Sequence, residues 1–113
     1  MKILISALLF LIGSSNAYCL KQVGYASWYG NENKISSTGK PIQHKYPALA
    51  HKSLPIGTMV KIVNTKNNSS VVAIVEDRGP YAKNRIADLN IAAAKAINIL
   101  TDGVVKVELN TLN

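Results

Sequence analysis

The chain has 113 residues, enough for one small domain and too few for two separate hydrophobic cores. Its 48% hydrophobic and 17% charged residues exclude an intrinsically disordered chain, and its single cysteine excludes an intramolecular disulfide framework. Thirteen Lys and Arg against six Asp and Glu give a formal charge of +7, which favours a polyanionic partner: nucleic acid, an anionic membrane or a bacterial wall.

Residues 1–17 have the organisation of a secretory signal peptide. Lys2 precedes an apolar run over residues 3–12, and small and polar residues follow up to Ala17, after which we expect cleavage. The run is shorter than the roughly 20 residues that span a bilayer, although an uncleaved anchor is the alternative. Loss of these 17 residues and their one lysine leaves 96 residues with a net charge of +6. We therefore expect a secreted or periplasmic protein, which does not meet nucleic acid.

Cys19 raises the alternative of a lipid-modified N-terminus. A lipidation site has a small residue just before the cysteine and an aliphatic residue three positions before it, but here these are Tyr18 and Asn16. We therefore expect Cys19 to be a lone thiol, with membrane attachment only if it is lipidated. Residues 18–22 form a short lead, and we place the folded domain at residues 23–110.

The first half of this domain is predicted to form short strands. Alternating apolar and polar side chains predict strands over residues 23–29 and 58–63, with a short apolar segment at 47–50 between them. Residues 70–75 are nearly all apolar, which predicts a strand buried on both faces. The turn residues at 64–69 predict a hairpin that joins the last two strands.

The second half begins with a break and contains one predicted helix. Gly79-Pro80 interrupts the apolar run and leaves Asp77 at the end of a strand. Asn90 is the predicted N-cap of a helix over residues 91–99, and residues 104–109 alternate as the closing strand. Several strands and one helix in so short a chain indicate a closed barrel, because closure removes exposed strand edges.

Four segments, in their order and spacing, resemble the RlpA family of rare lipoprotein A-like proteins. They are residues 26–30 (ASWYG), 50–58 (AHKSLPIGT), 76–81 (EDRGPY) and 85–94 (RIADLNIAAA). The resemblance covers residues 23–109 and implies a mainly β protein, a small six-stranded double-psi β-barrel with one or two short helices. It also implies a carbohydrate-binding groove, in a fold shared with the N-terminal domain of expansins.

The activity implied by this resemblance is lytic transglycosylation of peptidoglycan. In that reaction the muramoyl C6 hydroxyl attacks the anomeric carbon and closes a 1,6-anhydro ring, so one carboxyl group can act as acid and then as base. Asp77 matches the family's aspartate in the Asp-Arg-Gly-Pro segment and is the predicted catalytic residue. No cofactor is expected, and His44 with His51 is too little for a metal site.

The chain departs from the family pattern in the loop after residue 30. Active members carry a glutamate there and an aspartate three residues further on, whereas this chain has Lys40 and Gln43. A lysine ammonium near Asp77 would favour the charged carboxylate and make it a poorer proton donor. Glu32 and Glu76 are possible substitute acids, but Glu32 lies on a shortened loop and strand alternation should point Glu76 away from Asp77.

The predicted substrate-binding residues are aromatic, cationic or imidazole side chains of the matching segments and the nearby loop. They are Trp28, Tyr29, Lys40, His51, Arg78, Tyr81 and Arg85. Aromatic faces pack against the C–H faces of sugars, and because neighbours on a strand face opposite ways, one of the first two should be in the core. Tyr81 is the candidate expected to be exposed.

Each of these assignments has a structural alternative. Asp77 and Arg78 could form a salt-bridged corner, and His51 could serve only in a hydrogen bond. Arg85 could bond Asp88, which we expect to be a hydrogen-bonded structural acid. A group of lysines around the loop could be a solvated basic face or could attract wall carboxylates; these are Lys34, Lys40, Lys45 and Lys52.

The sequence therefore predicts an exported monomer that acts on peptidoglycan glycan strands. The enzyme hypothesis is transglycosylation with Asp77 as acid/base. The first alternative is a catalytically impaired glycan-binding module, because Lys40 and Gln43 replace acids. The second is an expansin-like wall-loosening protein or secreted effector that binds without cleaving bonds.

Overall fold

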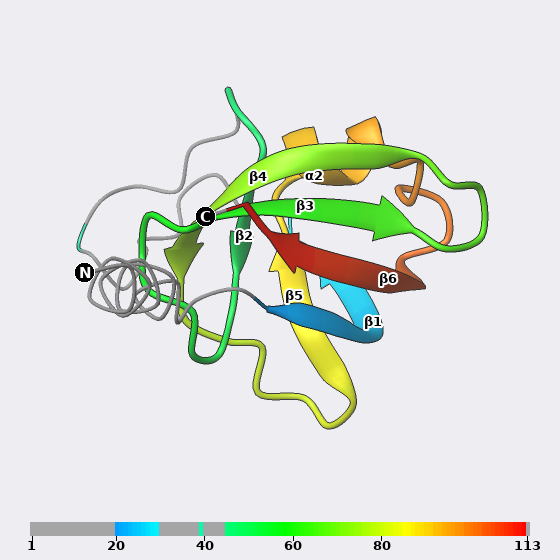
Figure 1. The fold of residues 1–113 in the computed structure, drawn as a ribbon. Helices are drawn as coiled ribbons and strands as arrows, with labels where there is room; N and C mark the ends of the chain where they lie inside the picture. Colours follow the sequence, from blue (N-terminus) through cyan, green and yellow to red (C-terminus); the bar gives the residue numbers. More distant parts are fainter. Residues whose placement is uncertain (1–19, 30–38, 40–44, 113) are drawn as a thin grey trace, which may run out of the picture.

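The computed structural model describes residues 20–29, 39 and 45–112 (Figure 1). The predicted signal peptide, Cys19 and the loop residues Glu32, Lys40 and Gln43 lie outside the described residues. Within the part that is described, no helix is long and apolar enough to cross a membrane.

The described chain forms one closed barrel of six strands and one short helix (Figure 1). The elements are β1 (Lys21–Trp28), β2 (Ala48–Ala50), β3 (Met59–Asn64), β4 (Ser70–Asp77), β5 (Arg85–Leu89), α2 (Ile91–Ala96) and β6 (Val104–Thr111). Around the barrel the strand order is β1-β5-β2-β4-β3-β6, with β1–β5 and β2–β4 parallel and the other pairs antiparallel. This confirms the mainly β, six-stranded barrel expected from the resemblance.

The barrel interior is filled by alternate residues of each strand. In β3, Val60 and Ile62 are fully buried while Met59 and Lys61 face outwards, as the alternation predicted. β3 and β4 form the predicted antiparallel hairpin. Each of these strands buries the face that points into the barrel and exposes the other face, because a closed sheet encloses a single interior.

The prediction that residues 70–75 are buried on both faces was wrong. Ala73 and Val75 are buried, but Val72 between them is 43% exposed. The helix α2 contacts β4 but leaves Val72 in solvent. A nearly continuous apolar run therefore does not distinguish a strand buried on both faces from one buried on a single face.

β5 was not predicted, and the helix is shorter than expected. The five residues of β5 include Arg85 and Asp88, so their alternation is weak, and the strand exists because β1 and β2 pair with it on either side. The helix ends at Ala96 rather than residue 99, because Asn98 has a positive φ of 60°. Isoleucine side chains just beyond the helix are fully buried and complete the core.

Asn90 confirms its predicted capping role and also joins three parts of the fold. Its Oδ1 accepts hydrogen bonds from the backbone N–H groups of Ala93 and Ala48, each at 3.0 Å. Its Nδ2 donates to the carbonyl oxygen of Tyr46 at 2.8 Å. The fully buried side chain of Asn90 therefore fixes the start of α2 against β2.

Candidate functional site

The candidate site lies where β1, β4 and β5 end, around the short strand β2. Ala50 of β2 is paired with Asp77 on one side and with Asp88 on the other. On the far side of Asp88, Ser27 of β1 is its pairing partner, and the Ser27 hydroxyl donates to Asp88 Oδ1 at 2.5 Å. The barrel therefore brings two carboxyl groups to positions separated by one strand. The hydrogen bond expected for Asp88 is present, but its place near Asp77 was not foreseen.

A register slip in β4 bears on the expected position of Glu76. Leu49 pairs with Val75, but the next residue, Ala50, pairs with Asp77, so that Glu76 is passed over. Such an irregularity can interrupt the strict alternation of side chains between the two faces. Glu76 was expected to point away from Asp77 if the strand continued that far. The strand does reach Asp77, and burial still alternates, with Asp77 buried and Glu76 half-buried, but the pairing with β2 is irregular at Glu76.

Tyr29 stands among the acidic groups of this region. Its backbone N–H donates to the carbonyl oxygen of Leu89 at 2.9 Å, which holds it beside the end of β5. Burial raises the pKa of Tyr29 far above its usual value, and the negative charges of Glu76, Asp77 and Asp88 raise it further. The Tyr29 phenol therefore stays protonated at neutral pH and can donate a hydrogen bond.

Arg78 braces the loop that follows β2. Its Nη1 donates to the carbonyl oxygens of His51 and Leu54, at 3.0 and 2.6 Å. Its backbone N–H donates to Asp77 Oδ1 at 2.8 Å, so the buried carboxyl of Asp77 is fixed where the strand ends. Arg78 therefore stabilises the loop that follows β2. Its predicted contact with the substrate stays a prediction.

His51 is held from both ring nitrogens. Nδ1 accepts hydrogen bonds from the backbone N–H groups of Ser53 and Leu54, at 3.2 and 3.1 Å, and Nε2 lies 2.9 Å from Gln22 Oε1. Burial lowers the pKa of His51, and the charges of Arg78 and Lys52 lower it further. The ring is therefore neutral at neutral pH, with its proton on Nε2, and it supports the loop structure. Its predicted sugar contact is untested.

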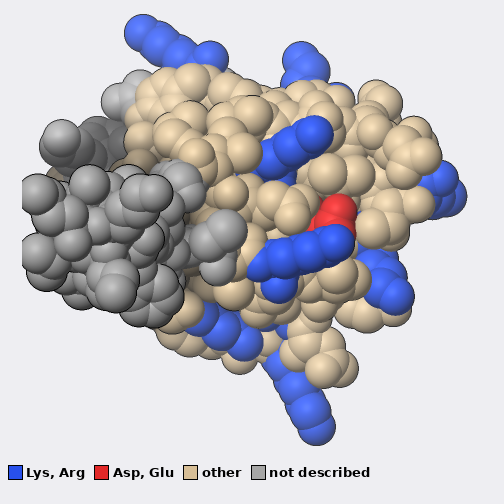
Figure 2. All heavy atoms as spheres, in the orientation of Figure 1, with Lys and Arg blue, Asp and Glu red and all other residues tan. Residues whose placement is uncertain are grey.

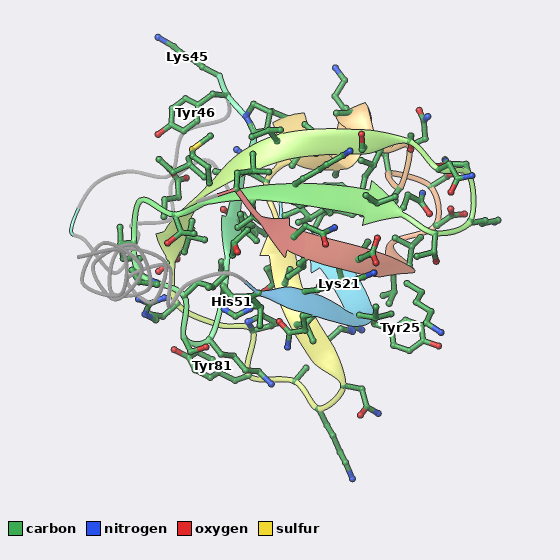
Figure 3. The ribbon with its side chains drawn as sticks, in the orientation of Figure 1. Lys21, Tyr25, Lys45, Tyr46, His51 and Tyr81 are labelled. Atoms are coloured by element: carbon green, nitrogen blue, oxygen red, sulfur yellow. The ribbon has the colours of Figure 1, made fainter. Side chains whose placement is uncertain are left out.

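The aromatic candidates divide into buried and exposed groups. Trp28 packs against the core, whereas Tyr81 is 86% exposed. Tyr46, which sequence reasoning did not select, is 42% exposed, and its hydroxyl donates to Glu76 Oε2 at 2.9 Å. In Figure 3, Tyr46 and Tyr81 lie on opposite sides of the end of β4. The only sequence signal for Tyr46 was its place just before Pro47 and β2.

Positive charge is distributed over the face of the molecule that Figure 2 shows. Lys and Arg side chains project from many parts of the described surface in this view, with little acidic surface among them. Lys21 pairs with Glu108 at 3.1 Å, and the described members of the predicted lysine group, Lys45 and Lys52, are both exposed. Arg85 is half-buried at the start of β5. No group of three or more His, Cys, Asp or Glu able to hold a metal occurs among the described residues.

Comparison with known proteins identifies relatives of the whole barrel. The family model described as lytic transglycolase matches residues 21–109. The probable endolytic peptidoglycan transglycosylase RlpA of Aquifex aeolicus (strain VF5) is 44% identical over 98 residues, covering 83% of this chain and 43% of the relative. The endolytic peptidoglycan transglycosylase RlpA of Rickettsia prowazekii (strain Madrid E) is 40% identical over 96 residues, covering 80% of this chain and 30% of the relative. The chain therefore spans less than half the length of these two relatives.

A solved structure agrees with the expected wider fold. A mutant expansin of Clavibacter michiganensis in complex with cellohexaose matches with a TM-score of 0.67 and 15% identity, covering 83% of this chain and 51% of that one. At this identity the likeness concerns the fold alone. The family model and the relatives at 40–44% identity go further, and they show that the chain belongs to the RlpA-like double-psi β-barrel family of lytic transglycosylases.

Proposed function

We propose that this protein is an exported enzyme that cleaves peptidoglycan glycan strands by lytic transglycosylation, with Asp77 as acid/base. The observation that carries the proposal is the position of Asp77. Asp77 is 7% exposed, ends β4, and lies one strand away from Asp88. The relatives of the chain are named peptidoglycan transglycosylases.

The reaction needs one proton delivered and one proton removed. Asp77 gives its proton to the glycosidic oxygen as the bond to the anomeric carbon breaks. The muramoyl C6 hydroxyl then bonds to that carbon, its proton leaves to a carboxylate, and a 1,6-anhydro ring closes without water. The buried Tyr29 phenol stays protonated, so it adds no further negative charge near these acids.

Glycan binding is supported by the aromatic side chains and by the surface charge. Tyr81 is largely exposed, so its ring is accessible to the apolar face of a sugar. The expansin of similar fold was solved with cellohexaose, a glycan chain. The excess of Lys and Arg would attract the anionic groups of a cell wall. We propose that Trp28, Tyr29, Lys40, His51, Arg78, Tyr81 and Arg85 belong to the binding surface.

A second candidate function is glycan binding with weak or no cleavage. The observation in its favour is that Lys40 and Gln43 stand where active family members carry acids. A binding module of this kind would sediment with purified peptidoglycan in a salt-dependent way and leave it intact. An expansin-like wall-loosening protein would share these two properties and would also weaken the wall mechanically.

The deciding experiment is incubation of the purified protein with peptide-free glycan strands, followed by mass analysis of the products. The enzyme proposal expects 1,6-anhydro ends, which appear in proportion to protein and are absent with Asp77→Asn. Sedimentation with the glycan and no new ends would contradict it and favour the binding module. Export is tested separately, because the secreted protein should begin at residue 18.

A further inference from the structure

Glu76 carries a buried oxygen atom that the mechanism above leaves without a role. One carboxyl oxygen, Oε2, accepts the hydrogen bond from the Tyr46 hydroxyl at 2.9 Å. The other, Oε1, is buried and has no hydrogen-bond partner within the described part of the chain. Leaving a buried polar atom unsatisfied costs about 1–3 kcal/mol, so such an atom at the edge of a site calls for an explanation.

The position of Glu76 ties it to the acids already described. It is adjacent to Asp77, at the register slip where β4 meets Ala50. Of the charged groups that raise the pKa of Tyr29, Glu76 has the largest effect, followed by Asp77 and Asp88. The negative charges of all three carboxyl groups act on this one phenol. Together with its place next to Asp77 in the chain, this links Glu76 to the acids at the end of β4.

We propose that Glu76 is the second carboxyl group of the transglycosylation site and that its Oε1 accepts the proton of the attacking C6 hydroxyl. This rests on the proposed function. Asp77 gives its proton to the leaving oxygen, the bond between that oxygen and the anomeric carbon breaks, and the C6 oxygen bonds to the same carbon. The step leaves Asp77 charged and Glu76 protonated, and exchange of protons with water restores the starting state.

Tyr46 is the positioning residue for this carboxyl group. Its carbonyl oxygen is held by Asn90 Nδ2 at 2.8 Å, which anchors its backbone to the start of α2. Its hydroxyl occupies Oε2, so Oε1 is the oxygen left to take a proton. The hydrogen bond to Glu76 raises the pKa of Tyr46, which keeps the phenolic proton in place.

The test compares Glu76→Gln and Tyr46→Phe with Glu108→Gln, measuring the rate of anhydro-end release from peptide-free glycan strands. Glu108 is a matched control because it lies on β6 and pairs with Lys21 at 3.1 Å. Glu76→Gln should lower kcat about 10²–10⁴-fold with little change in KM, the usual effect of removing a general base. Tyr46→Phe should lower kcat about tenfold, and Glu108→Gln should leave both constants unchanged.

A rescue experiment covers the case in which a variant folds poorly. Glu76→Ala leaves space for a small carboxylate, and formate should restore part of its kcat, an effect that a purely structural role would not produce. Wild-type kcat in Glu76→Gln, or no effect of formate on Glu76→Ala, would overturn the role of Glu76 and leave the proposed function standing. If the wild-type protein releases no anhydro ends, both proposals fail together.

Discussion

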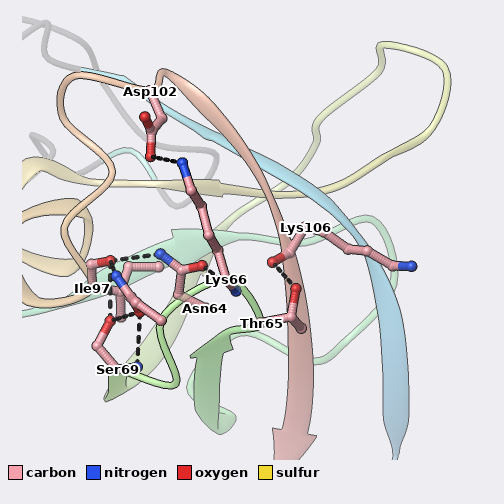
Figure 4. Close-up of polar contacts among 8 residues, drawn as sticks. Asn64, Thr65, Lys66, Ser69, Ile97, Asp102 and Lys106 are labelled. Carbon is pink, nitrogen blue, oxygen red and sulfur yellow. Dashed lines mark hydrogen bonds and ion pairs between the residues drawn. The ribbon is translucent and has the colours of Figure 1, made fainter.

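The two ends of β4 differ in how their buried polar groups are hydrogen-bonded. At the start of the strand these groups bond one another, whereas at its end one carboxyl oxygen has no hydrogen-bond partner among the described residues. Asn64, just before the β3–β4 turn, is fully buried, donates to the carbonyl oxygen of Ile97 at 2.8 Å and accepts from the Lys66 N–H at 3.0 Å (Figure 4). Ser69 donates to the same Ile97 carbonyl at 3.1 Å. At the other end, Glu76 Oε1 is buried and lacks a partner among the described residues.

This difference indicates that one end of β4 serves stability and the other end serves the proposed activity. The turn end fastens the hairpin to the residues after α2, and its hydrogen bonds contribute to the free energy of unfolding. The opposite end places Asp77 and Asp88 on either side of one strand, and repulsion between two negative charges does not stabilise the fold. Mutations at the two ends should therefore separate activity from stability.

The largest expected effect is on activity, from Asp77→Asn. The amide keeps an oxygen that can accept the Arg78 N–H, so the fold should persist, but it cannot exchange the proton. We expect the release of anhydro ends to fall about 10²–10⁴-fold with Tm nearly unchanged. Asp102→Asn, which alters an exposed pair with Lys66 at 3.9 Å, is the control and should keep full activity. An active Asp77→Asn enzyme would remove this aspartate from the mechanism.

Asn64→Ala should show the opposite pattern. It removes both hydrogen bonds of a fully buried side chain, so the free energy of unfolding should fall by about 1–3 kcal/mol in a denaturant titration. The activity of the folded fraction should be unchanged. Thr65→Val is the control, because its hydroxyl bonds the Lys106 carbonyl from an exposed position and should cost less (Figure 4). An equal loss in both variants would contradict the importance of burial at this turn.

Tyr81→Ala should weaken glycan binding without changing the chemical step. The exposed ring contributes little to the core, so Tm should hold, while loss of one stacked aromatic should raise KM by roughly three- to tenfold. Tyr25→Ala provides a control, since Tyr25 is also exposed but lies on β1 beside Lys106 of β6. If the two variants bind glycan strands equally well in a sedimentation assay, Tyr81 is not a sugar platform.

The smallest expected effect is a pH dependence of stability that comes from His51. Because the folded pKa of His51 is lowered, the unfolded chain binds more protons below about pH 6.5. Stability should therefore be complete above that value and be lost progressively as the pH falls through the lowered pKa. His51→Asn keeps an acceptor for the loop N–H groups but has no titrating ring, so its unfolding midpoint should vary less with pH. Equal slopes would contradict this role.

Much of the local structure could be predicted from the sequence. The outward positions of Met59 and Lys61, the β3–β4 hairpin and the cap at Asn90 follow from side-chain periodicity and from capping chemistry within a few residues. The strand end at Asp77 followed from the Gly-Pro break just beyond it. These features depend on neighbours in the chain, so the sequence carried enough information to specify them.

The membership of the family was also accessible, because it rests on four ordered segments that are visible in the sequence. The expected covering of β4 was wrong, since no local pattern states which layer packs on a strand. The strand β5 was missed for a related reason: its polar residues lie between two partners that come from distant parts of the chain.

What only the tertiary structure decided is the composition of the candidate site. Asp88 meets Ser27 across 61 residues, Glu76 meets Tyr46 across 30, and Arg78 reaches the carbonyl of His51 across 27. Such contacts depend on strand register, and a shift of one residue leaves Glu76 without a paired residue on β2. The sequence by itself determined the strands other than β5, the family and the acid at the end of β4. The closure of the barrel determined which side chains surround that acid, because pairing between distant strands sets their positions.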